Sequence, residues 1–198
     1  MGASGNQPSE SVSVYIHSIF GVCERSQYSL NVSCTNPSGD RNDFNDLRDL
    51  RKQIRDAHNY YRCLHGVPPL KLQGKLNKYA QKAAEDNARK GALMPSGGLY
   101  GENLYSSYGV PVNGLAITKF WYDKIKDYNF NYPAFSSSQF SQVVWLSSTG
   151  LGCGYIKNAN EWSYIVCSYD PPGNIPTPEQ FSKNVPLPLY TINNNDYI

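Results

Sequence analysis

Three histidines, at positions 17, 58 and 65, are the side chains of this sequence whose ordinary pKa lies closest to neutral pH. A serine or cysteine hydrolase would need one of them as a base beside a nucleophile. His58 could act with Glu102 as base and orienting carboxylate, and residues 138–141 contain two serines, but nothing in the sequence brings these groups together. His65 stands at a predicted helix end, where a structural hydrogen bond is its expected role. We therefore expect a protein that is not an enzyme.

The five cysteines could form disulfides, and the clearest pair is Cys153 with Cys167. Residues 151–157 and 163–170 read as two strands around the turn-like Asn158–Asn160. Position 160 is the midpoint between the two cysteines, so a symmetric hairpin would bring them face to face. Directly opposed residues lie about 4.5–5.5 Å apart, which is within disulfide reach. We predict this bridge.

Of the other three cysteines, Cys23, Cys34 and Cys63, at most two can form a disulfide, so one thiol stays unpaired within the chain. The sequence leaves the pairing open, and a bridge from Cys23 to Cys34 would close the shortest loop. Disulfides indicate an oxidising compartment. Asn31-Val32-Ser33 is an acceptor sequence for N-glycosylation, which fits the same compartment. Residues 1–10 lack the pattern of a signal peptide. We therefore expect a secreted, extracellular protein whose printed chain begins after processing, which agrees with the disulfides, the acceptor sequence and the missing signal.

Composition excludes two classes of function. Eighteen basic and sixteen acidic residues leave a formal charge of +2 without a block of like charges, so we expect no nucleic-acid partner. No stretch approaches the roughly 18 apolar residues that a membrane span requires. With 198 residues, one globular domain and a monomer are the expectation.

Apolar periodicity changes along the chain from helical to strand-like. Helices followed by strands, without regular alternation, predict an α+β fold, arranged as a three-layer α-β-α sandwich with a central antiparallel sheet. We predict an N-terminal extension over 1–45, a folded domain over 46–175 and a C-terminal extension over 176–198 that has no helical or strand period. The predicted helices are 43–65, 76–90 and 113–126, and the predicted strands are 99–105, 142–146, 151–156 and 164–169.

Four segments carry a resemblance to a known family. They are His58-Asn59-Tyr60-Tyr61-Arg62 with His65-Gly66-Val67-Pro68-Pro69-Leu70, Gly101-Glu102-Asn103-Leu104, Phe140-Ser141-Gln142-Val143-Val144-Trp145, and Tyr164 to Asn174. In order and spacing they resemble the CAP superfamily, also called SCP/TAPS, which contains cysteine-rich secretory, antigen 5 and pathogenesis-related-1 proteins. The extensions and the His-Gly-Val-Pro-Pro-Leu context look most like venom-allergen-like proteins secreted by parasitic worms.

The resemblance implies a central cleft in which two histidines and two acids can hold zinc. His58 matches the first histidine and Glu102 the first acid. Lys124 stands where the second acid is expected after Trp-Tyr-Asp, and Gln139 stands where the second histidine is expected. Zinc needs about three protein ligands of histidine, cysteine or carboxylate type. We expect a degenerate cleft with no metal and no cofactor, in which Lys124 pairs with Glu102.

An aromatic segment, Tyr128 to Phe135, follows the third predicted helix. Pro133 disfavours a helix here, and the rings of a loop cannot all be buried, so we expect an apolar surface that binds a ligand. Tyr128, Phe130 and Phe135 match the pattern called a caveolin-binding motif, which lies in this loop in sterol-binding CAP relatives. The predicted lipid-binding residues are Tyr128, Phe130, Tyr132 and Phe135.

The resemblance also implies that a fatty acid could lie between two helices, where the alanine-rich stripe of residues 76–88 leaves room. Close helix packing through the same alanines is the alternative. The function predicted from the sequence is binding of a sterol, a fatty acid or both. A protein-interaction module that engages a host receptor or plasma protein is the alternative function.

Overall fold

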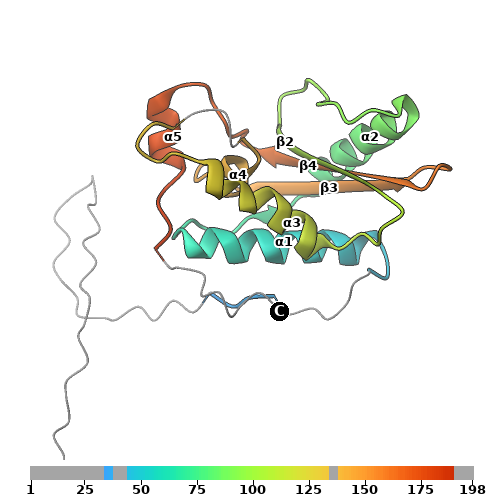
Figure 1. The fold of residues 1–198 in the computed structure, drawn as a ribbon, viewed down its shortest axis with the longest axis horizontal. Coiled ribbons are helices and arrows are strands. Elements are labelled where there is room, and N and C mark those ends of the chain that lie inside the picture. The colour runs from blue at the N-terminus through green and yellow to red at the C-terminus, as the bar shows by residue number, and fades with distance from the viewer. Residues whose placement is uncertain (1–33, 38–43, 134–137, 190–198) are drawn as a thin grey trace, which may run out of the picture. The chain divides into compact units, whose positions relative to one another are not determined.

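The computed structural model describes residues 34–37, 44–133 and 138–189, all of which belong to one compact unit (Figure 1). Its helices are α1 (Leu47–Leu64), α2 (Gly74–Lys90), α3 (Gly114–Tyr122), the 3-10 helix η1 (Asp123–Asp127), α4 (Ser138–Val143) and α5 (Pro178–Asn184). Its strands are β1 (Lys71–Leu72), β2 (Gly101–Tyr108), β3 (Gly150–Lys157) and β4 (Trp162–Asp170).

The four strands form one sheet in the order β1-β3-β4-β2. β2 and β3 both pair antiparallel with β4, whereas the short β1 runs parallel to β3. The α+β prediction is confirmed, and the sheet is mixed rather than purely antiparallel. Helix α2 covers one face of the sheet, and α1, α3 and α4 pack on the other (Figure 1).

Helix α1 begins at an N-cap that its sequence supplies. The Asp46 carboxylate accepts hydrogen bonds from the backbone N–H groups of Arg48 and Asp49. The buried face of the helix includes Leu50 and Ile54, at the spacing expected of one side of a helix.

Helix α2 packs directly on the sheet through small residues. Ala80 and Ala84 are fully buried beside Val166. A Cβ atom on Gly152 or Gly154 would lie less than 3 Å from the backbone of α2. The alanine stripe therefore packs closely against the sheet, and not against a second helix as predicted, and it leaves no room for a fatty acid at this contact.

Two disulfides fasten the described chain. Cys153 and Cys167 are opposed in the β3–β4 hairpin with a Cα–Cα distance of 4.2 Å, as predicted. Cys34 pairs with Cys63 of α1 at 5.7 Å, which leaves the shorter Cys23–Cys34 alternative unused. Cys23 and Asn31 lie outside the described residues.

Two elements differ from the sequence-based predictions. Residues 142–146 were predicted as a strand, but residues up to Val143 belong to α4. The segment after Asp170 was predicted to lack a helix, yet it contains α5, whose Phe181 ring is 1 % exposed and packs 5.3 Å from Trp145. The predicted extension over 176–198 therefore contributes to the core.

Candidate functional site

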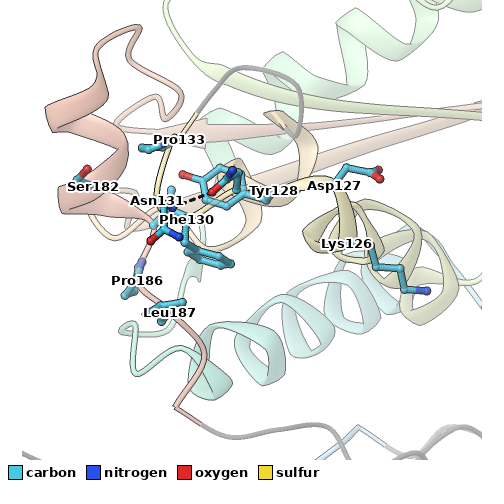
Figure 2. Close-up of a pocket in the computed structure, with 11 residues that line it drawn as sticks. Lys126, Asp127, Tyr128, Phe130, Asn131, Pro133, Ser182, Pro186 and Leu187 are labelled. Atoms are coloured by element: carbon cyan, nitrogen blue, oxygen red, sulfur yellow. Dashed lines mark hydrogen bonds between the residues drawn. The ribbon is translucent and has the colours of Figure 1, made fainter.

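A groove of about 650 Å³ lies between the aromatic segment and the end of α5 (Figure 2). One wall is made by the end of η1 and the residues that follow it, and the opposite wall comes from about 55 residues further along the chain. The lining residues are Lys126, Asp127, Tyr128, Asn129, Phe130, Asn131 and Pro133 on the first wall and Ser182, Val185, Pro186 and Leu187 on the second. Its volume falls within the range of small-molecule sites in proteins.

The rings of the first wall are held by the core beneath them. Tyr128 is 7 % exposed, and its ring lies edge-on to Phe140 at 5.2 Å and to Phe130 at 4.8 Å. Phe130 also lies 6.2 Å from Phe140 and stays partly exposed. Burial raises the pKa of Tyr128 to about 12, so its phenol is neutral at physiological pH. The wall is therefore apolar and uncharged where its two rings meet the groove.

The sequence pattern does not predict the second wall, because its residues are far from the aromatic segment in the chain. A local signal for α5 was nevertheless present. Thr177 caps the helix by accepting from the Gln180 N–H at 3.3 Å, Pro178 occupies its first turn and Glu179 adds an acidic side chain there. Such a pattern is typical of a helix start.

The predicted lipid-binding residues are divided by the structure. Tyr128 and Phe130 line the groove, whereas Tyr132 is 79 % exposed and is not part of the lining. Phe135 lies outside the described residues.

His58 lies in the core and not in a cleft, so its predicted place is wrong. Its ring is fully buried on the core face of α1, with Nδ1 2.8 Å from the Ile54 carbonyl oxygen and Nε2 2.7 Å from the Tyr169 hydroxyl. A carbonyl only accepts, so Nδ1 carries the hydrogen and Nε2 accepts from Tyr169. Asn103 in turn donates to the Tyr169 oxygen at 3.2 Å.

This buried network fixes the protonation of His58. Burial lowers the pKa of His58 to about 3, the Ile54 hydrogen bond opposes that change, and the charge of Arg62 adds slightly to it. The partners of His58 in the described chain include no serine or cysteine, and its ring cannot be reached by a substrate. His58 is a structural histidine.

Glu102, Lys124 and Gln139 do not assemble with His58. Glu102 accepts from the backbone N–H of Ser96 at 2.7 Å through Oε2, and its buried Oε1 has no hydrogen-bond partner among the described residues. The Nζ atom of Lys124 lies 5.3 Å from the centroid of the Phe120 ring. The ion pairs of the described chain do not include one between Lys124 and Glu102, so that predicted pair is wrong.

Gln139 contacts β2 at the edge of the sheet. Its side-chain amide donates to the Leu104 carbonyl at 3.3 Å, and its backbone carbonyl accepts from Asn103 at 3.0 Å. Within residues 34–37, 44–133 and 138–189, no three side chains of histidine, cysteine, aspartate or glutamate gather at one place. The residues near Glu102 therefore do not fit the zinc site that the resemblance implies.

With the fold and the groove established, comparison with known proteins gives the family. The sequence profile of CAP, the cysteine-rich secretory protein family, matches residues 55–169, so this chain belongs to the CAP family. Secreted protein RBT4 of Candida albicans is 43 % identical over 145 residues, which cover 70 % of this chain and 40 % of the relative. The human Golgi-associated plant pathogenesis-related protein 1 is 37 % identical over 145 residues, which cover 70 % of this chain and 93 % of the relative.

Solved structures support the fold. BmVAL-1 matches with a TM-score of 0.55 at 19 % identity, over 67 % of this chain and 81 % of that chain. The hookworm platelet inhibitor matches with a TM-score of 0.51 at 24 % identity, over 62 % and 69 % of the two chains. Identity to the fungal and human relatives is higher, so the expected likeness to worm proteins is supported at the level of the fold alone. Among the described residues, no helix is both long and apolar enough to cross a membrane.

Proposed function

We propose that this chain is a secreted, non-catalytic CAP protein that binds a sterol or a fatty acid in the groove beside Tyr128 and Phe130. The groove supports the proposal because two core-anchored rings face an apolar wall across a volume suited to a small ligand. Burial of apolar surface contributes about 25 cal/mol per Å², so binding would need little polar chemistry. Tyr132 and Phe135 remain proposed contributors at the end of the same segment.

Secretion is part of the proposal. Two disulfides fit an oxidising compartment, and a Candida albicans relative carries the word secreted in its name. The chain spans 40 % and 41 % of two fungal relatives, so activities of those longer proteins are not transferred to it. We propose a monomer that could carry a glycan on Asn31 and that has no nucleic-acid partner.

Phe130→Ala is expected to weaken cholesterol binding at least tenfold. An apolar side chain of this size contributes about 1.5–3 kcal/mol when it is buried by a ligand, and 1.4 kcal/mol is a factor of ten. Binding is measured with radiolabelled cholesterol and, separately, with radiolabelled palmitate, each competed by the other to decide between the two classes.

Phe120→Ala is the matched control, because Phe120 is a 45 % exposed ring on α3 that does not line the groove. Equal dissociation constants for cholesterol in wild type and Phe130→Ala would show that the groove is not the binding site. If wild type retains neither cholesterol nor palmitate, lipid binding itself is refuted.

We propose that the residues around Glu102 bind no metal. Titration of the full chain with zinc chloride is expected to give no tight one-to-one complex, because no three potential zinc ligands gather around Glu102 among the described residues. A tight complex that is lost in Glu102→Gln would contradict this proposal. His58→Ala is unsuitable for the test, since His58 holds the core together.

A protein-interaction module is the second candidate, and an exposed aromatic pair favours it. Tyr108 and Trp162 are 62 % and 41 % exposed, and their rings lie 5.5 Å apart where β2 ends and β4 begins. Tyrosine and tryptophan are enriched in protein interfaces. Capture of an extracellular protein that is lost in the Tyr108→Ala, Trp162→Ala double variant, together with failure of both lipid assays, would favour this candidate.

A further inference from the structure

The second wall of the groove is a short segment that we name the C-terminal strap, residues Val185–Leu189. Val185, Pro186 and Leu187 of the strap line the groove opposite Tyr128 and Phe130. Figure 2 shows Pro186 and Leu187 on the C-terminal segment, on the side of the groove toward which the Phe130 ring extends. The width of the groove therefore depends on where the strap lies.

Little apolar packing holds the strap beyond Val185. Leu187 is 62 % exposed and Leu189 is 56 % exposed, so their side chains gain little from burial. In the described part of the chain, two hydrogen bonds attach this stretch to the end of α1. His65 Nδ1 lies 2.6 Å from the Pro186 carbonyl oxygen, and the Leu189 N–H donates to the Leu64 carbonyl at 2.8 Å.

The His65 ring contacts the strap and the residue that supports the aromatic wall. The Pro186 carbonyl can only accept, so Nδ1 carries the hydrogen and Nε2 accepts from the Tyr122 hydroxyl at 2.9 Å. The ring also lies 5.6 Å from Phe140, the residue on which Tyr128 and Phe130 pack. With 2 % exposure, His65 is fixed between the strap and the support of the aromatic wall.

We propose that His65 is a positioning residue that holds the C-terminal strap in place as the second wall of the groove. The consequence for ligand affinity rests on the proposed function, whereas the attachment of the strap does not. The hydrogen bond to Pro186 ties a weakly buried segment to the rigid end of α1. Without it the strap moves outward and the groove widens.

Two substitutions separate the two hydrogen bonds of the ring. His65→Asn places an N–H donor at the position of Nδ1 and keeps the bond to Pro186. His65→Gln places its polar atoms further out, at the position of Nε2, and loses that bond. Both variants remove the aromatic ring, so a merely structural role would affect both alike, as urea unfolding measures.

Hydrogen exchange of the Leu189 amide is the first readout, because it reports on the strap without any ligand. The amide is expected to exchange about tenfold faster in His65→Gln than in wild type and near the wild-type rate in His65→Asn. Equal exchange rates in the two variants would overturn the inference, whether or not the protein binds a lipid.

Affinity for radiolabelled cholesterol is the second readout. We expect about tenfold weaker binding in His65→Gln and near wild-type binding in His65→Asn. Leu187→Ala removes an exposed strap side chain without touching the core, and it is expected to weaken binding about fivefold. Unchanged affinity in Leu187→Ala would contradict the strap as a wall of the site. If wild type binds no cholesterol, the proposed function fails and the exchange experiment alone decides the inference.

Discussion

Arg62→Met is expected to lower the free energy of unfolding by about 4 kcal/mol or more. The Arg62 guanidinium is fully buried and donates to four backbone carbonyls, those of Pro68, Val143, Trp145 and Ser148, at 2.7 to 3.2 Å. Methionine fills much of the volume but donates to none of them. Each buried acceptor left unsatisfied costs about 1–3 kcal/mol, part of which a rearranged backbone recovers.

The four carbonyls belong to segments that are far from each other in the sequence. Pro68 follows the end of α1. Val143 is the last residue of α4, and Trp145 and Ser148 lie between α4 and β3, so the arginine joins parts of the chain about 80 residues apart. Burial lowers the pKa of Arg62 to about 10, which leaves it charged at neutral pH. Among the described residues its hydrogen-bond partners are carbonyl dipoles and not a carboxylate.

Urea unfolding followed by circular dichroism measures the effect of Arg62→Met. Arg89→Met is the matched control, because Arg89 is 72 % exposed and forms a surface ion pair with Asp86, which is worth at most about 1 kcal/mol. A loss below about 1 kcal/mol in Arg62→Met would show that water or backbone movement satisfies the four carbonyls.

The sequence predicts well those elements in which the spacing of apolar residues or cysteines is set within the element itself. Leu50 and Ile54 recur at helical spacing on α1, and the two cysteines stand at mirror positions about the turn of the β3–β4 hairpin. These patterns are local, because an amphipathic helix or a hairpin sets its own register. The α+β class and one disulfide followed from them.

Helix α4 shows where periodicity is ambiguous. Phe140, Val143, Val144 and Trp145 are all fully buried, and so are the polar Ser141 and Gln142, so this segment has no exposed polar side that would reveal its period. A short continuous apolar run is compatible with a buried strand or a buried helix. β1 has two residues, which is too few for any pattern.

The candidate site was predictable in part, for the same reason. The aromatic segment is local in sequence and proved to line a groove, but its second wall comes from tertiary contacts that no spacing encodes. The buried position of His58 could have been predicted from the sequence. His58 stands four residues after Ile54 on the apolar side of α1, a position that favours the core over a cleft.

Lowering the pH from 7 to 5 is expected to reduce the free energy of unfolding by about 3–4 kcal/mol. Burial lowers the pKa of His58 to about 3 and that of His65 to about 4, whereas an unfolded histidine titrates near pH 6.5. Both histidines are neutral in the folded state over this range. Protons bind the unfolded state first, so stability is complete above about pH 6.5 and falls as the pH drops toward 4.

The size of the effect follows from linkage. Each unfolded histidine that takes up a proton contributes a slope of up to about 1.4 kcal/mol per pH unit, so two give roughly twice that value near pH 5. Ordinary carboxylates titrate near pH 4, below the range of the measurement. Urea unfolding at intervals between pH 7 and 5 gives the slope directly.

One variant tests whether the pH dependence of the free energy of unfolding comes from the two buried histidines. His17 lies outside the described residues and is replaced by glutamine in every sample, so its titration does not enter. In that background His65→Asn removes one of the two buried histidines and is expected to halve the slope while the sign stays the same. A stability that is constant between pH 7 and 5, or a slope unchanged by His65→Asn, would mean that the rings gain protons without unfolding. The interior around α1 would then be more accessible to water than the 0 % and 2 % exposure of the two histidines implies.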